Sequence, residues 1–211
     1  MKLYVINRDY IDYLKQFDDK VPNVDYEDRF KLFLGKVNIS YDSAMSYYIP
    51  LTSGSKAKFE TMDNRLDFIK ITDQVDGEII GAIDINNMIP APDMVVKEFK
   101  YDLVRESPDF ATVEERKKYF DMSMNELDYL NKMEDHIINN AKTIFSIYRS
   151  NTKQFQNLRK RCCKFINLYN RALEFSDVLD YEADNVIEKI STQFKESRDT
   201  DRSKEKGGME L

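Results

Sequence analysis

The sequence YYIPLTSGSK at residues 47–56 runs from apolar and aromatic residues into two hydroxyl residues, a glycine and a lysine. The aromatic and β-branched start of this stretch favours a β-strand. Pro50 and Gly54 are expected to end regular pairing, because proline has no N–H for a ladder. Thr52 and Ser53 would then lie on a loop or at a strand end, where functional side chains are common. The alternative is that both hydroxyls only satisfy backbone groups nearby, as in ordinary turns.

A second strand-like run precedes this stretch and predicts its partner. Residues 30–37 and 45–51 have the composition of two strands, and the polar residues between them favour a β-hairpin. In an antiparallel pair the start of the first strand lies opposite the end of the second. We therefore expect Lys31 to lie at the same end of the sheet as Thr52 and Ser53.

The rest of the N-terminal half also has the pattern of short strands. Alternation predicts a strand at residues 2–6, and Asn7 is suited to cap a helix with Tyr10, Leu14 and Phe17 on one face. A second hairpin pattern and a sixth candidate strand follow at residues 66–72, 78–86 and 94–99.

From Thr112 the apolar residues recur every three or four positions, which is typical of helices. We expect a long amphipathic helix up to Tyr148, with a break near Ser123, and further helices at residues 165–175 and 178–194. Strands followed by helices predict one α+β domain over residues 1–195. Its antiparallel sheet of five to six strands would lie mainly in residues 1–100 and its helices in 112–195. Residues 196–211 are charged and predict a disordered tail.

Composition excludes several kinds of site. The chain has one histidine, His136, so neither a two-histidine acid–base pair nor a histidine-rich metal site is available. Cys162 and Cys163 are adjacent, which suits reduced, structural thiols. The sequence lacks the glycine-rich nucleotide-binding motifs. We expect no metal and no other cofactor.

Two further features bear on where the chain is located. No apolar run reaches the roughly 18 residues that a membrane helix needs. The first twelve residues are too polar for a signal peptide. We expect a cytoplasmic protein that does not bind a membrane.

The charges are distributed unevenly along the chain. The net charge is −6, which by itself argues against a nucleic-acid partner. Residues 136–173, however, contain no aspartate or glutamate where the composition predicts about seven. Such a segment attracts polyanions, and aromatic residues interleaved with it could stack on bases. The alternative is a solvated basic face above a hydrophobic stripe. The segment contains eight basic residues: Lys142, Arg149, Lys153, Arg159, Lys160, Arg161, Lys164 and Arg171.

Several short segments together resemble a known family. They are YVI at 4–6, YIDYL at 10–14, DDKVPN at 18–23, KLFLG at 31–35, Tyr47 followed by PLTS at 50–53, and INNMIP at 85–90, with a weaker match at Cys162 and Cys163. In this order they resemble the ToxN/AbiQ endoribonuclease toxins of type III toxin-antitoxin systems, and most of all the CptN-like branch.

The resemblance implies a strongly twisted antiparallel sheet, related to the Kid and MazF toxins and to SH3-like barrels, surrounded by helices. It implies metal-independent, sequence-specific cleavage of cellular RNA and of the toxin's own repeat RNA precursor, leaving 2′,3′-cyclic phosphate ends. The implied inhibitor is a small pseudoknot RNA derived from those repeats, which alternates with the toxin in a closed ring such as three of each. The implied role is phage defence by abortive infection, with RNA and not DNA as substrate.

The resemblance also assigns roles to positions of this sequence. Its catalytic residues fall on Ser53, Thr52 and Lys31, and on Tyr26, where the loop length differs from that of relatives. Lys56 or Lys58 would replace a lysine that follows the serine in the family. The expected RNA-binding residues are Lys56, Lys58, Tyr47, Lys142, Arg149, Lys153, Arg159, Lys160, Arg161 and Lys164.

Two other functions stay open from the sequence. One is an RNA-binding module of the same fold without catalytic activity. The other is a protein-interaction domain that uses the helical region 113–148, although that apolar stripe could simply pack on the sheet. Cyclic phosphate ends on RNA incubated with the protein would distinguish the nuclease from both.

Overall fold

The structure is a computed structural model that describes residues 1–23, 30–39, 45–53, 57–150 and 152–181. Residues Met1–Ala172 form one compact unit, and the chain from Leu173 onward forms a second. The predicted domain boundary at residue 195 and the predicted tail at 196–211 lie outside the described residues, as does most of the helix predicted at 178–194.

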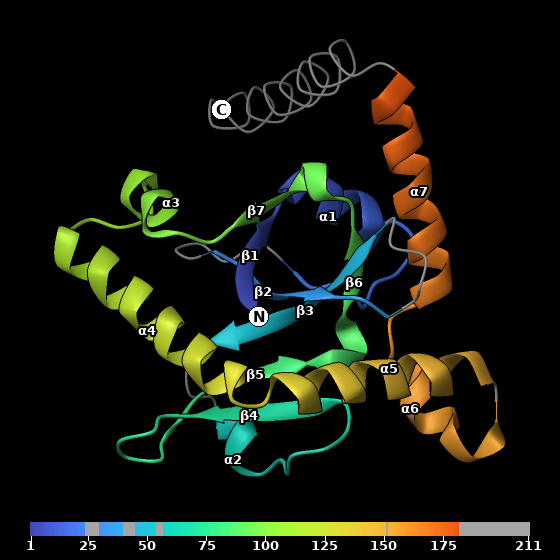
Figure 1. Cartoon of the computed structure of the whole chain (residues 1–211), viewed down its shortest axis with the longest axis horizontal. Helices are drawn as coiled ribbons and strands as arrows, with labels where there is room; N and C mark the ends of the chain where they lie inside the picture. Colours follow the sequence, from blue (N-terminus) through green and yellow to red (C-terminus); the bar gives the residue numbers. More distant parts are fainter. Residues whose placement is uncertain (24–29, 40–44, 54–56, 151, 182–211) are drawn as a thin grey trace, which may run out of the picture. The chain divides into compact units, whose positions relative to one another are not determined.

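Short strands and 3-10 turns come first in the chain, and α-helices fill the second half (Figure 1). In order, the elements are β1 (Lys2–Ile6), α1 (Arg8–Lys15), β2 (Leu32–Val37), β3 (Ser46–Ser53), α2 (Ala57–Glu60), β4 (Phe68–Thr72), β5 (Ile79–Asp84), η1 (Ile85–Asn87), β6 (Ile89–Ala91), η2 (Asp93–Val95), β7 (Val96–Glu98), α3 (Tyr101–Glu106), α4 (Val113–Asn131), α5 (Glu134–Ser150), η3 (Lys153–Phe155), α6 (Gln156–Arg161) and α7 (Phe165–Tyr181).

Seven strands of the described residues form one antiparallel sheet in the order β4-β5-β3-β2-β1-β7, and β6 pairs with β3 outside this path. Both predicted hairpins are present, as the β2–β3 and β4–β5 pairs. The α+β class is confirmed. The sequence predicted five to six strands, and the strand it missed is β6, whose three residues are too few to show an alternating pattern.

Strand β3 pairs with neighbouring strands on both of its edges. One edge pairs with β2, from Tyr47 opposite Val37 to Pro50 opposite Phe33. The other edge pairs with β6 at residues 46–48 and then with β5 at residues 51–53. The expectation that Pro50 ends regular pairing is wrong. Pro50 lies where this second edge passes from β6 to β5, so its missing N–H falls between the two ladders.

Helix α1 forms where the sequence predicts it and packs on the sheet. The side chain of Asn7 caps the helix by accepting from the N–H groups of Asp9 and Tyr10, at 2.7 and 3.3 Å. Tyr10, Ile11 and Leu14 are fully buried on one face. The hydroxyl of Tyr10 donates to the carbonyl oxygen of Pro90 at 2.7 Å, which ties α1 to β6 and satisfies a buried polar group.

Helix α4 continues through Ser123, so the expected break at that residue is wrong. The hydroxyl of Ser123 donates to the carbonyl oxygen of Tyr119 at 2.9 Å, which accommodates a serine inside a helix. The helix begins with a capping box formed by Thr112 and Glu115. The interruption comes at Lys132 and Met133, between α4 and α5. In Figure 1 the two helices follow one another beside β4 and β5.

Gly35 in β2 provides space for an aromatic ring on the neighbouring strand. A Cβ atom at Gly35 would lie 2.5 Å from Cδ1 and 2.7 Å from Cε1 of Tyr48, and 3.3 Å from Cδ2 of Tyr4. The rings of Tyr4 and Tyr48 meet edge to face at this point, with centroids 5.3 Å apart. Because Tyr48 is fully buried, its ring has no space to move away.

We therefore expect Gly35→Ala to lower the free energy of unfolding by about 1–3 kcal/mol, the usual cost of overpacking a core. Urea denaturation followed by circular dichroism measures it. In a Tyr48→Leu background, which lacks the ring edge, the same substitution should cost clearly less. Equal costs in both backgrounds would contradict the steric explanation.

Candidate active site

The hydroxyl end of β3 and Lys31 lie together, as the hairpin predicts. The ammonium group of Lys31 donates to the carbonyl oxygen of Leu51 at 2.7 Å, and Lys31 is 9% exposed. Thr52 and Ser53 complete β3 and pair with Ala82 and Gly81 of β5. A largely buried cation thus lies beside the last two residues of β3, which pair with β5. This end of β3, with Lys31, carries the predicted catalytic residues and for that reason is called the catalytic end below.

Helix α4 supports this end of the sheet. The hydroxyl of Tyr119 donates to the carbonyl oxygen of Phe30 at 3.2 Å, directly before Lys31. Seven residues along the same face, Glu126 is fully buried. A Cβ atom at Gly81 would lie 2.7 Å from Oε1 of Glu126 and 3.0 Å from the carbonyl oxygen of Thr52. Glu126 therefore presents a carboxyl group to β5 beside the residues that pair with the catalytic end.

Sequence reasoning missed Glu126. Within α4 the apolar residues that recur every three or four positions are Phe120, Met124, Leu127 and Leu130, of which Leu130 is buried and the other three are half-buried. The buried face of α4 carries Tyr119, Ser123, Glu126 and Leu130. An apolar pattern cannot reveal a face that is buried and partly polar. A glycine in the middle of a strand was the available signal, because Gly81 indicates close approach by another group.

The structure describes the other predicted catalytic-end residues only in part. Tyr26 and Lys56 lie outside the described residues. The backbone of Ser53 is placed by its pairing with Gly81, and Lys58 belongs to the short helix α2.

The predicted basic residues lie on α5, η3, α6 and the start of α7. Lys142, Arg149, Lys153, Lys160 and Lys164 are exposed. Within the described part of the chain, none of these five makes an ion pair, although Lys164 donates to the carbonyl oxygen of Phe17 at 2.9 Å. These five residues are called the basic face below, and exposed cations of this kind can contact phosphates.

Two arginines of the same segment already have partners in the fold. Both Nε and Nη2 of Arg161 donate to Oδ2 of Asp67, at 3.0 and 2.7 Å. Asp67 is 2% exposed, so this pair neutralises a buried carboxylate and joins α6 to the start of β4. The guanidinium of Arg159 lies over the ring of Tyr148 at 5.7 Å.

Tyr47 belongs to an aromatic cluster in the core. Its ring lies 5.7 Å from that of Phe145, 6.3 Å from Phe165 and 6.5 Å from Tyr169, and Tyr47 is 3% exposed. Burial raises the pKa of its hydroxyl well above the usual value. A ring enclosed in this way has no face open to a base. The aromatic residues interleaved with the basic segment here join α5 and α7 to β3.

The cysteines and the histidine have structural surroundings. Cys162 and Cys163 are free thiols and buried, and burial raises the pKa of Cys162 to about 12. His136 is exposed on α5, with its Nε2 atom 3.2 Å from the side-chain nitrogen of Asn140. Among the described residues, no cluster of three or more histidine, cysteine or acidic side chains could hold a metal ion, and no helix is long and apolar enough to cross a membrane.

Comparison with known proteins gives the class to which this fold and site belong. The family described as "Toxin ToxN, type III toxin-antitoxin system" matches residues 2–173. This places the chain among the toxins of toxin-antitoxin systems. It belongs to the ToxN family of type III systems.

Individual relatives agree with this assignment. The endoribonuclease ToxN of Bacillus thuringiensis subsp. kurstaki is 25% identical over 182 residues, covering 83% of this chain and 84% of that protein. The endoribonuclease ToxN of Pectobacterium atrosepticum is 37% identical over 94 residues, 43% of this chain and 53% of that protein.

Solved structures share the fold. A type III toxin studied for its selective inhibition by a non-coding RNA pseudoknot has a TM-score of 0.69 at 23% identity, covering 83% of this chain and 97% of the other. The lactococcal anti-phage endoribonuclease AbiQ has a TM-score of 0.64 at 24% identity, covering 83% and 98%. A protein from a bacterial antiviral system regulated by a processed non-coding RNA has a TM-score of 0.62 at 26% identity, covering 82% and 98%.

Mutation can distinguish the structural role of Arg161, which pairs with Asp67, from that of the exposed residues of the basic face. Arg161→Ala leaves a buried carboxylate without its bidentate partner, with Arg65 at 3.6 Å as a weaker one. We expect it to lower the free energy of unfolding by about 1–3 kcal/mol. Arg149→Ala, at an exposed site without an ion pair to a described residue, should change it by less than about 0.5 kcal/mol. Thermal and urea denaturation measure both, and equal effects would mean that Arg161 is ordinary surface.

Proposed function

We propose that this protein is the toxin of a type III toxin-antitoxin system and acts as a metal-independent, sequence-specific endoribonuclease. The observation that carries the proposal is the family match over residues 2–173, because two curated relatives in it are endoribonucleases. The position of Lys31 beside Thr52 and Ser53 supports it, since a cation and hydroxyl groups at one strand end suit a phosphodiester.

In the proposed reaction the RNA supplies its own nucleophile. The 2′-hydroxyl loses a proton and its oxygen forms a bond to the adjacent phosphorus. The bond from phosphorus to the 5′-oxygen breaks, and that oxygen takes up a proton. The products are a 2′,3′-cyclic phosphate and a 5′-hydroxyl. The protein has to align the three atoms in line and offset the charge that gathers on the phosphate oxygens.

The catalytic end supplies groups for these tasks. The ammonium group of Lys31 donates to the carbonyl oxygen of Leu51, which places a positive charge at the end of β3. In the proposed site this charge offsets the negative charge of the phosphate. The hydroxyls of Thr52 and Ser53 hydrogen-bond the phosphate oxygens or position the 2′-hydroxyl, and no covalent enzyme intermediate is needed. Tyr26 and a lysine at position 56 or 58 complete the proposed set.

The basic face is the proposed contact for the RNA partners. Relatives are inhibited by a non-coding RNA pseudoknot or regulated by a processed non-coding RNA. We propose a small repeat-derived pseudoknot RNA as the antitoxin of this chain, in a closed assembly in which protein and RNA alternate. The protein would cut both the repeat precursor and cellular RNA. Because relatives act in antiviral and anti-phage systems, the proposed role is abortive infection.

The role of Ser53 is open to a direct test. Purified protein with a mixed-sequence RNA and EDTA should give fragments with 2′,3′-cyclic phosphate ends, identified by mass spectrometry. Ser53→Ala should lower the cleavage rate at least about 100-fold, the usual loss for a group that stabilises a transition state. Its affinity for RNA should change less than about threefold, because the electrostatic contacts remain.

Ser46→Ala is the matched control, since Ser46 begins the same strand and its hydroxyl donates to Asn38 at 3.1 Å. It should cleave at the wild-type rate. Full activity in Ser53→Ala would remove Ser53 from the mechanism. Binding by the wild type without any cleavage would instead favour an RNA-binding module that lacks catalysis.

The basic face is tested by salt dependence. Single variants such as Lys142→Gln and Lys153→Gln, made in the Ser53→Ala background, should weaken RNA binding. Each should make the slope of log affinity against log salt shallower by about 0.7–0.9 for the phosphate contact it loses. Fluorescence anisotropy at several salt concentrations measures the slope. Lys117→Gln, exposed on α4 and outside the basic face, should leave it unchanged. Unchanged slopes in both Lys142→Gln and Lys153→Gln would mean that the basic face is solvated surface.

A further inference from the structure

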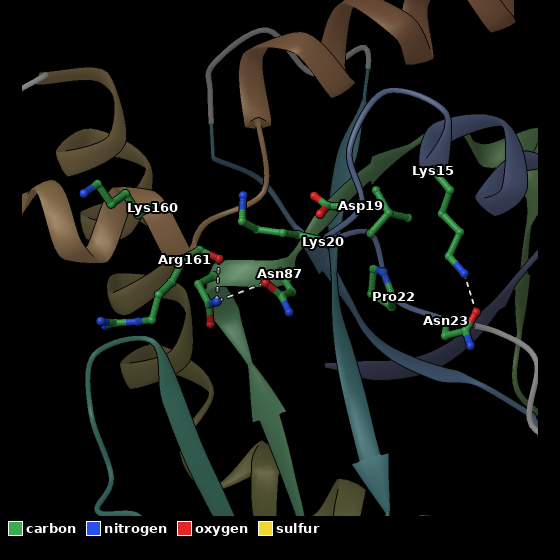
Figure 2. A pocket seen from close by; sticks show the side chains of 10 residues that line it. Lys15, Asp19, Lys20, Pro22, Asn23, Asn87, Lys160 and Arg161 are labelled. Carbon is green, nitrogen blue, oxygen red and sulfur yellow. Dashed lines mark hydrogen bonds between the residues drawn. The ribbon is translucent and has the colours of Figure 1, made fainter.

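A second polar site lies at the opposite end of β5 from Gly81. It is a pocket of about 770 Å³, a volume within the usual range for ligand sites (Figure 2). Three segments line it: the end of α1 and the loop after it, the 3-10 turn η1, and the end of α6. The lining residues are Lys15, Asp19, Lys20, Val21, Pro22, Asn23, Asn86, Asn87, Lys160 and Arg161.

Buried polar groups hold these three segments together. Asp18, which is 2% exposed, accepts from the backbone N–H groups of Lys20 and Lys164. The carbonyl oxygen of Asn86 accepts from the N–H of Cys163 at 2.8 Å, and its side-chain nitrogen donates to the carbonyl oxygen of Arg161 at 3.0 Å. Segments that are distant in sequence are therefore fixed around the pocket before any ligand binds.

The cations of the pocket divide into two kinds. Arg161 is engaged with Asp67, and the ammonium group of Lys15 donates to the side chain of Asn23. Lys20 and Lys160, in contrast, make no ion pair with any other residue in the described ranges. The lining also contains one carboxylate, that of Asp19, so the pocket keeps a net positive charge. A positively charged pocket with lysine side chains favours an anion such as a phosphate.

Asn87 adds a directional polar group to the pocket. Its Oδ1 atom accepts from the side-chain nitrogen of Asn86 at 2.9 Å, which fixes the orientation of the amide. Its own Nδ2 atom carries two donors, and Oδ1 retains a second lone pair. Figure 2 shows this amide between the side chains of α6 and those of the loop after α1. Asparagine amides recognise the edges of nucleobases, and unpaired bases can reach them.

We propose that this pocket binds one nucleotide of single-stranded RNA, with its phosphate on Lys20 and Lys160 and the edge of its base against Asn87. The inference rests on the proposed endoribonuclease function. It adds a recognition subsite away from the bond that is cut.

The chain itself sets the distance between the two sites. Gly81 pairs with Ser53, and Asn87 follows six residues later along β5 and η1. The rise per residue is about 3.3 Å in a strand and about 2 Å in a 3-10 turn. Three residues of each separate Gly81 from Asn87, which gives a distance of roughly 16 Å along the chain. An extended RNA strand covers that distance in a few nucleotides. The pocket would therefore contribute to sequence preference at a position a few nucleotides from the cleaved bond.

The test uses the full-length protein and a pool of RNA oligonucleotides with randomised sequence. Sequencing both sides of each cut gives the base preference at every position. The wild type should show preferences next to the cut and a separate one a few nucleotides away. Asn87→Asp keeps the acceptor that holds Asn86 but replaces the two donors with an oxygen. It should abolish the distant preference, leave the preference next to the cut, and slow cleavage by no more than about tenfold.

Asn157→Ala, at an exposed asparagine of α6 outside the pocket lining, is the control and should keep both preferences. A wild type that cuts no RNA would overturn the proposed function. A wild type that cuts, with an Asn87→Asp variant that folds and keeps the distant preference, would overturn the pocket alone.

A second measurement tests the phosphate contact. In the Ser53→Ala background, Lys20→Gln and Lys160→Gln together should reduce the salt slope of binding to a randomised single-stranded RNA by about 0.7 for each lysine. An unchanged slope would overturn the phosphate contact. A reduced slope combined with an unchanged base preference would make the pocket a general anion site and overturn the base contact.

Discussion

The rest of the structure depends on the pairing of β3 along both of its edges. One edge of β3 pairs with β2 at residues 47–50, and the other pairs first with β6 at residues 46–48 and then, at residues 51–53, with residues 81–83 of β5. A shift of this strand by one residue would turn every side chain to the opposite face of the sheet. It would remove Tyr47 from the aromatic cluster and carry Thr52 away from Lys31. The core and the catalytic end are therefore set by the same register.

Much of the fold could be predicted because its elements have strong local signals. The two hairpins, the capped helix α1 and the change to helical periodicity all follow from residue patterns within about fifteen positions of one another. The strand β6 could not be predicted, since it is short and gains its stability from β3. The sequence pattern predicted an interruption of the long helix near Ser123. In the structure the hydroxyl of Ser123 donates to a carbonyl oxygen within α4, and the helix continues. The interruption lies about ten residues later, at Lys132 and Met133.

The candidate sites were predictable to different degrees. A hairpin fixes Lys31 opposite Thr52 from sequence alone, because an antiparallel pair leaves little choice. Glu126 and Asn87 reach their places through long-range packing: one on a helix laid against β5, the other through a contact between η1 and the end of α6. No local pattern contains that information. The basic segment was visible as a charge pattern, but the pattern could not separate Arg161, which neutralises Asp67, from the exposed lysines around it.

The segment without acids gives the molecule a charge distribution that its total charge conceals. With an isoelectric point near 5.1, the protein carries its negative charge outside residues 136–173. A charge separation of this kind along the chain raises the local concentration of polyanions near the basic segment, although the total charge is negative. The acidic residues outside this segment repel nucleic acid that approaches them. Under the proposed function, an acidic protein would in this way bind RNA through one segment while its other segments repel RNA.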